Sequence, residues 1–105
     1  VVSDTMVGGA TLTKLLGTSA WYAPGASVAF LVDSILNDYK RMIPCSVLLE
    51  GEYGLNDLCI GVPCIIGANG VESIVDIKLN QTEQDLLKES ANKVQIMNAA
   101  LNEIL

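Results

Sequence analysis

The hydrophobic residues of this chain change their spacing twice, and this change limits the folds that the chain can adopt. They recur at helical spacing up to Met42, at strand spacing from Ile43 to Leu79, and again at helical spacing from Glu83 onward. The predicted order is two helices, three antiparallel strands and a final helix. This order favours an α+β fold, with helices packed on a three-stranded antiparallel sheet and a long C-terminal helix, over a parallel βαβ arrangement.

Two helices are predicted in the first part of the chain. The first covers Thr11–Leu16 and ends at Gly17, and the second covers Ala26–Arg41, with Pro24 opening it. The second helix is apolar nearly all round, so we expect it to contact another domain or subunit. Its narrow polar stripe is interpreted as a solvated edge that includes Asp33, Lys40 and Arg41.

The strand region divides into three runs separated by turn-forming residues. The runs are Ile43–Glu50, Leu58–Ile66 and Val71–Leu79, with a turn at Gly51–Gly54 and a hairpin at Ala68-Asn69-Gly70. Because proline donates no ladder hydrogen bond, an edge position is predicted for Pro44, and a bulge or an edge for the run that contains Gly61 and Pro63.

The final helix is predicted from Glu83 almost to the end of the chain. Thr82, followed by Glu83 and Asp85, resembles a capping arrangement that places carboxylates near the helix N-terminus. One face of this helix is predicted to join the core, through Leu87, Ala91, Val94, Met97, Leu101 and Ile104.

Composition excludes several classes of partner. Only 17% of the 105 residues are charged, against about 25% in a typical domain, so part of the surface is expected to be covered. The net charge of −6 argues against nucleic acid, which requires clustered basic residues. No run is long enough to cross a bilayer and no signal peptide is recognisable, so we expect no membrane partner. The odd number of cysteines indicates free thiols in a reducing compartment, so a cytoplasmic location is expected.

The residues that most often carry chemistry are scarce. There is no histidine and no G-x-G-x-x-G motif, so the sequence holds no dinucleotide cradle. The three cysteines contain no C-x-x-C pair and are interpreted as free thiols, with Cys59 and Cys64 in the core and no metal site. Glu50 and Glu52 are interpreted as solvated carboxylates and not as an acid–base pair. Trp21 and Tyr22 are interpreted as packing or interface residues and not as ligand contacts.

Three stretches resemble malate dehydrogenases of the lactate dehydrogenase superfamily. GGATLTKLLGTSAWYAPGAS at Gly8–Ser27 resembles the family's helix and pocket loop. Arg41–Asn80, which includes IPCSV, GEYG and GANG, resembles the three C-terminal strands, and Thr82–Val94 resembles the terminal helix. The stretches occur in the family's order and cover nearly the whole chain.

The resemblance implies that residues 1–105 are the C-terminal catalytic domain of a dehydrogenase that interconverts malate and oxaloacetate by hydride transfer. The family binds NAD on an N-terminal Rossmann domain, which this chain lacks, and its proton-relay histidine matches no position here. No catalytic residue is therefore assigned. We expect the chain alone to be inactive and to bind no NAD, and we expect a homo-oligomer.

The pocket loop supplies the site residues that the resemblance implies. Ala20 matches a position where lactate enzymes carry threonine, and its small side chain leaves room for the second carboxylate of oxaloacetate. Pro24 matches the position that packs on the nicotinamide ring, and Ser19 and Ser27 belong to the same substrate pocket. A dry, shaped wall of this kind favours hydride transfer.

Two other classes of function remain open. The apolar second helix suits a self-associating, non-enzymatic module. A small hydrolase using Ser19 or Ser27 would need a base other than histidine, and neither Lys14 nor Asp33 has a suitable spacing.

Overall fold

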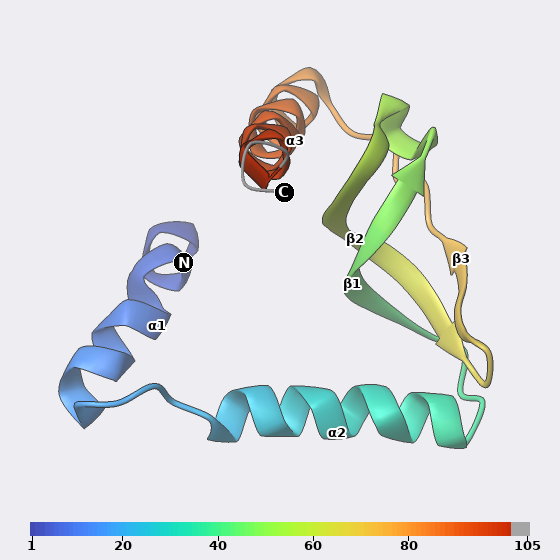
Figure 1. Ribbon diagram of the computed structural model, residues 1–105. Coiled ribbons are helices and arrows are strands. Elements are labelled where there is room, and N and C mark those ends of the chain that lie inside the picture. The colour runs from blue at the N-terminus through green and yellow to red at the C-terminus, as the bar shows by residue number, and fades with distance from the viewer. Residues whose placement is uncertain (102–105) are drawn as a thin grey trace.

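The computed structural model describes residues 1–101, which form the elements in the predicted order (Figure 1). The sheet is antiparallel with the order β1-β2-β3, and α2 and α3 both contact its central strand. The α+β fold with a long C-terminal helix is confirmed. The elements are α1 (Val2–Leu16), α2 (Tyr22–Leu36), β1 (Arg41–Glu50), η1 (Glu52–Gly54), β2 (Asn56–Gly67), β3 (Gly70–Ile74) and α3 (Gln81–Leu101).

The core lies on one face of the sheet. Side chains of β2 alternate between buried and more exposed, and Leu49 of β1 and Leu58 of β2 are 0% and 1% exposed. Leu31 and Ile35 of α2 pack against this face, as do residues of α3. The buried apolar residues are Leu49, Leu58, Ile60, Val62, Cys64, Ile66 and Ala91.

The prolines of the sheet occupy two different positions. Pro44 lies on the edge strand β1, as predicted, but Pro63 lies opposite it on the central strand, so the edge position predicted for β2 is wrong. The carbonyl of Pro63 accepts a hydrogen bond of 2.8 Å from the Val75 N–H. Proline returns no N–H to Val75, so this pair has one bond where a regular ladder has two. The missing bond accounts for the end of β3 at Ile74, short of the predicted Leu79.

Bulges occur in the sheet at other residues than Gly61 and Pro63. Glu50 pairs with Asn56 while Leu49 pairs with Leu58, which leaves Asp57 as the extra residue, at φ 55°. In β3, the register shift leaves Glu72 without an opposite residue. A bulge re-aims the side chain that it carries. It turns Glu72 toward Gly67 and the end of α2.

Helix α2 begins and ends earlier than predicted. Pro24 lies inside its first turn, where backbone N–H groups have no partner within the helix and a missing donor costs little. At the other end Asn37 caps the helix, and Asp38 and Lys40 have φ values of 49° and 51°, which no helix continues. Arg41 therefore begins β1 and is not part of the helix.

Helix α3 has a different cap from the one predicted. The Asn80 side-chain oxygen accepts from the Glu83 N–H at 3.0 Å, and the Glu83 carboxylate accepts from the Asn80 N–H at 2.9 Å. This reciprocal pair is a capping box, so Asn80 replaces Thr82 as the N-cap. Of the predicted core face, Leu87, Ala91 and Val94 pack against the sheet, whereas Met97 and Leu101 are exposed. Ile104 lies outside the described residues.

One further expectation on burial is wrong. Cys59 is exposed and is not a core thiol, whereas Cys64 is buried as predicted; both are free, as is Cys45. Burial raises the pKa of the Cys64 thiol above its ordinary value. Trp21 and Tyr22 are 68% and 88% exposed, so neither packs within the described residues, and their predicted place in an interface stays a prediction.

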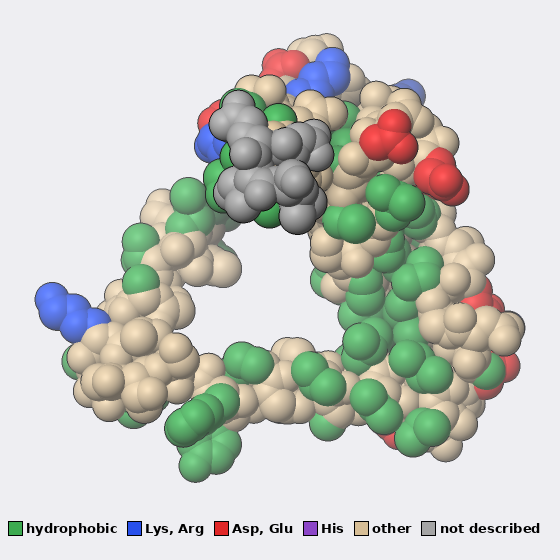
Figure 2. Space-filling model, in the orientation of Figure 1, with side chains coloured by type: hydrophobic (Ala, Val, Ile, Leu, Met, Phe, Trp, Pro, Cys, Tyr) green, Lys and Arg blue, Asp and Glu red, His purple; other side chains and the backbone are tan. Residues whose placement is uncertain are grey.

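The described residues form an open arrangement. Their radius of gyration is 16.2 Å, whereas a compact domain of this length has about 13 Å. Figure 2 shows an open space bounded by α1, α2, the sheet and α3, with hydrophobic side chains over the strands beside it. Within residues 1–101, no helix is long and apolar enough to cross a membrane.

Candidate functional site

The predicted pocket residues lie in the connector from α1 to α2 and in the first half of α2. Gly17 ends α1 at φ 71°, a left-handed conformation that favours glycine, and its N–H donates to the Thr13 carbonyl at 3.0 Å. Ser19 and Ala20 follow in the connector, and Pro24 and Ser27 lie in the first two turns of α2. The structure thus gathers the four residues at one end of one helix.

This stretch forms an open wall. Ser19, Pro24 and Ser27 are exposed, and Ala20 is half-buried. Two hollows within residues 1–101 lie elsewhere: one follows α1, and the other lies between α3 and the segment that leads to it from β3. The part of the chain that the structure describes has no group of three or more histidine, cysteine, aspartate or glutamate side chains that could hold a metal ion.

The opposite end of α2 carries a polar cluster that the sequence did not reveal. The Arg41 Nη1 donates to the Asp33 carboxylate at 3.0 Å and to the Ser34 hydroxyl at 3.2 Å. Its guanidinium also lies over the rings of Phe30 and Tyr39, 4.5 and 4.2 Å from their centroids. We call this set the Arg41 bracket. The expectation that Asp33 and Arg41 form the solvated edge of one helix is wrong, because Arg41 joins β1 to α2.

Ser34 is the buried member of the Arg41 bracket. It is fully buried, and its hydroxyl donates to the Phe30 carbonyl at 2.9 Å while it accepts from Arg41. The side-chain amide of Asn37 donates a hydrogen bond of 2.9 Å to the other oxygen of the Asp33 carboxylate. The sequence held one usable signal, because Asn37-Asp38 is a turn-forming pair that could have ended the predicted helix before Arg41.

A second polar cluster joins the end of α2 to the hairpin between β2 and β3. The Lys40 ammonium forms ion pairs with Glu72 at 3.1 Å and Asp38 at 3.8 Å. Asp38 also accepts a hydrogen bond of 2.8 Å from the Ala68 N–H. The hydrogen bond to Glu72, followed by the charges of Asp38 and Glu72, raises the pKa of Lys40. Lys40 therefore lies beyond the end of α2 and binds the hairpin, so its predicted place on the solvated edge of that helix is wrong.

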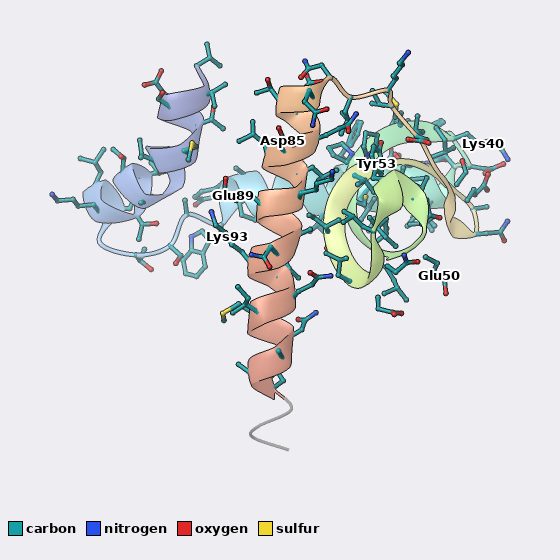
Figure 3. The ribbon with its side chains drawn as sticks, turned by 90° about the horizontal axis from the view of Figure 1, so that it is seen from above. Lys40, Glu50, Tyr53, Asp85, Glu89 and Lys93 are labelled. Carbon is teal, nitrogen blue, oxygen red and sulfur yellow. The ribbon has the colours of Figure 1, made fainter. Side chains whose placement is uncertain are left out.

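Tyr53 fastens the segment that leads from β3 to α3 (Figure 3). Its hydroxyl donates to the Val75 carbonyl at 2.5 Å and accepts from the Ile77 N–H at 3.1 Å. Tyr53 lines a groove of about 420 Å³ between this segment and α3, together with Lys78, Leu87 and Lys88. The groove lies apart from the connector that carries Ser19 and Ala20.

Replacing Tyr53 by phenylalanine should lower the free energy of unfolding by about 1 kcal/mol, because two backbone groups lose their partner. Urea unfolding measures this loss, and hydrogen exchange should show faster exchange of the Ile77 amide. Tyr22→Phe is the matched control, because Tyr22 is 88% exposed. Equal stability of the two variants would contradict the structural role of the Tyr53 hydroxyl.

The Glu52 carboxylate is bound by the backbone next to it. The Glu52 carboxylate accepts from the Glu50 backbone N–H at 2.7 Å, and this hydrogen bond, followed by one from its own N–H, lowers the pKa of Glu52. On α3, Glu89 pairs with Lys93 at 2.8 Å on the side away from the strands (Figure 3). The hydrogen bond and charge of Lys93 lower the pKa of Glu89.

Similarity to known proteins covers nearly all of this structure. The family model of the lactate/malate dehydrogenase alpha/beta C-terminal domain matches residues 2–103. The malate dehydrogenase of Flavobacterium frigidimaris is 73% identical over 105 residues, which are 100% of this chain and 34% of that protein. The malate dehydrogenase of Bacteroides thetaiotaomicron is 64% identical over 104 residues, which are 99% of this chain and 33% of that protein.

Solved structures agree with these relatives. A malate dehydrogenase from Salinibacter ruber superposes with a TM-score of 0.95 at 45% identity, covering 98% of this chain and 34% of that one. A lactate dehydrogenase from Eimeria maxima, solved with NADH and oxamate, gives a TM-score of 0.93 at 41% identity over 97% of this chain and 32% of that one. The chain spans about a third of the length of these proteins.

Proposed function

Because this chain belongs to the lactate/malate dehydrogenase family, as its alpha/beta C-terminal domain, we propose that it forms the substrate side of an NAD-dependent malate dehydrogenase. The reaction is hydride transfer between malate and NAD, which yields oxaloacetate and NADH. These 105 residues contain no histidine and no glycine-rich dinucleotide motif. The proton acceptor and the NAD cradle are therefore assigned to residues outside this chain.

One observation carries the proposal: the malate dehydrogenase of Flavobacterium frigidimaris matches all of this chain at 73% identity. The open arrangement supports it, because large apolar side chains on all three helices are exposed, among them Leu15, Phe30 and Ile96. Apolar patches of more than a few hundred Å² are rarely left uncovered. A cofactor domain, and further copies in a homo-oligomer, would cover such surface.

The connector between α1 and α2 is the proposed pocket wall. Ala20 is small and half-buried, and it would leave room for the second carboxylate of oxaloacetate. Pro24, in the first turn of α2, would contact the nicotinamide ring of NAD, and Ser19 and Ser27 would line the substrate side. In support, a lactate dehydrogenase of the same fold has been solved with NADH and oxamate.

A chimera tests the proposal. The matching 105 residues of the Flavobacterium frigidimaris protein are replaced by this chain, and NADH formation from malate and NAD is followed for the chimera, the unaltered relative and this chain alone. We expect the chimera to be active and the chain alone to be inactive. A folded chimera without activity beside an active relative would overturn the proposal, as would an ordinary rate from the chain alone.

Ala20→Thr in the chimera should lower kcat/KM for malate about tenfold, because the added methyl and hydroxyl groups occupy the space proposed for the second carboxylate. The steady-state rates with malate and with lactate measure this effect, and the ratio should move toward lactate. Ala99→Thr on the exposed side of α3 is the matched control. An unchanged ratio would remove Ala20 from the proposed pocket.

The exposed apolar helices also suit a second function, a non-enzymatic module that self-associates through α2. Val28, Phe30 and Val32 of α2 are 59%, 50% and 43% exposed and would be covered in such an assembly. Sedimentation of the chain alone, together with the activity of the chimera, separates the two functions. A stable assembly of the chain and an inactive chimera would favour the module.

A further inference from the structure

The Arg41 bracket holds only one end of α2. Arg41 begins β1, and it contacts three residues of α2 and one of the following connector. Leu31 and Ile35 pack against the core within the same half of the helix. In the other half, every residue from 22 to 29 is exposed within the described chain. This exposed half of α2 begins at the proposed pocket wall.

The geometry of the bracket fixes a direction as well as a distance. The guanidinium is planar, and its hydrogen bonds run to Asp33 and Ser34 on one helical turn while its face lies over Phe30 and Tyr39. Its side chain is 33% exposed, so water screens its ion pair with Asp33. The bracket therefore constrains the angle between α2 and β1 more than it strengthens the fold.

Within the described residues α2 is held at one end, so a change of its direction at that end displaces the other end. Ten residues separate Ser34 from Pro24, which corresponds to about 15 Å at the helical rise of 1.5 Å per residue. A tilt of about 4° at Ser34 moves Pro24 by about 1 Å, and a displacement of this size at reacting groups can lower a rate about a hundredfold.

We infer that Arg41 is a positioning residue, which sets the direction of α2 and thereby places Ala20 and Pro24 against substrate and nicotinamide. This inference rests on the proposed function, because the chemistry at the free end of α2 is part of that proposal. The bracket itself is made entirely of described residues. It touches neither substrate nor cofactor in this assignment.

Kinetics of the chimera test the inference. Arg41→Met keeps the apolar stem of the side chain and removes its charge and hydrogen bonds, so kcat/KM for malate should fall about ten- to a hundredfold, mainly through kcat. The Kd for NADH should change less than about twofold, because its cradle is assigned outside this chain. Arg41→Lys should recover part of the loss, since it restores the charge but not the planar fork. Lys93→Gln, which removes the 2.8 Å ion pair with Glu89, should leave the kinetics unchanged.

A distance measurement tests the direction of α2 without relying on catalysis. The background is a chimera from which the other reactive cysteines have been removed. Spin labels are attached at Tyr22→Cys and Val71→Cys, where both native side chains are exposed, and they report the distance from the N-terminal end of α2 to the sheet. Arg41→Met should broaden or shift that distance distribution, and Lys93→Gln should leave it unchanged.

The outcomes are distinguishable. An unchanged distance distribution in the Arg41→Met variant would overturn the inference, whatever the kinetics. Kinetics within about twofold of the parent chimera would also overturn it, even if the helix moved. A chimera with Arg41 intact that cannot oxidise malate would instead overturn the proposed function, and the spin-label distances would still decide whether Arg41 directs α2.

Discussion

Replacing Leu49 by alanine should lower the free energy of unfolding by about 2–5 kcal/mol, the largest loss of stability expected for a single substitution in this chain. Leu49 is 0% exposed and lies opposite Leu58 at the end of the β1–β2 ladder. Few apolar residues are buried in the described chain, so a cavity here removes a large share of the core. Typical domains are stable by only about 5–15 kcal/mol.

The adjacent residue provides the control. Leu48 lies on the same strand and is 53% exposed, so Leu48→Ala removes the same atoms and should cost less than about 1 kcal/mol. Urea unfolding followed by circular dichroism compares the two variants. Equal losses would show that the sheet buries both faces or neither, against the placement of the core described above.

Gly67→Ala should lower the free energy of unfolding by about 1 kcal/mol, because its Cβ would displace the ends of two carboxylate side chains from their partners. A Cβ atom at Gly67 would lie 2.6 Å from the Glu72 Cδ and 2.7 Å from the Asp38 Oδ1. These carboxylates also bind Lys40 and the Ala68 N–H, so displacing them disrupts the polar cluster between α2 and the hairpin.

Gly61→Ala on the same strand is the matched control. A Cβ at Gly61 meets nothing within 4 Å, so alanine should raise stability by about 0.5 kcal/mol through its smaller backbone entropy. Adding Glu72→Ala to Gly67→Ala should recover part of the loss if the clash with Glu72 is its cause. Opposite signs for the two glycine variants in urea unfolding are the expected result, and a stabilised Gly67→Ala variant would contradict it.

Local patterns predicted most of the architecture. The hairpin at Ala68-Asn69-Gly70 is confirmed as a two-residue loop, with Gly70 at φ 85°. The sheet-facing residues Leu87, Ala91 and Val94 of α3 are also confirmed. These features follow from spacing and turn chemistry alone.

Helix ends were harder to predict, because contacts distant in sequence decide them. Asp38 and Lys40 adopt left-handed conformations while bonded to Ala68 and Glu72, some thirty residues away. At α3, the patterns Asn80-x-x-Glu83 and Thr82-x-x-Asp85 overlap, and spacing alone does not choose between two possible caps. The structure selects Asn80.

The candidate site was only partly predictable for a similar reason. The family resemblance located the connector that carries Ser19 and Ala20, whose roles remain predictions. It gave no indication of the Arg41 bracket, since that cluster joins a strand to a helix that the pattern had merged into one element. When residues outside this chain complete a pocket, the spacing of the residues within the chain gives little indication of that pocket.

The position of Pro44 has a consequence for aggregation. The Pro63 carbonyl points toward β3, so in an antiparallel ladder the backbone of the opposite Pro44 points to the free edge of β1. That edge therefore lacks one donor where an incoming strand from another molecule would need it. Pairing of another chain with β1 is therefore disfavoured at Pro44, and this protects the exposed edge strand from adding strands and forming fibrils.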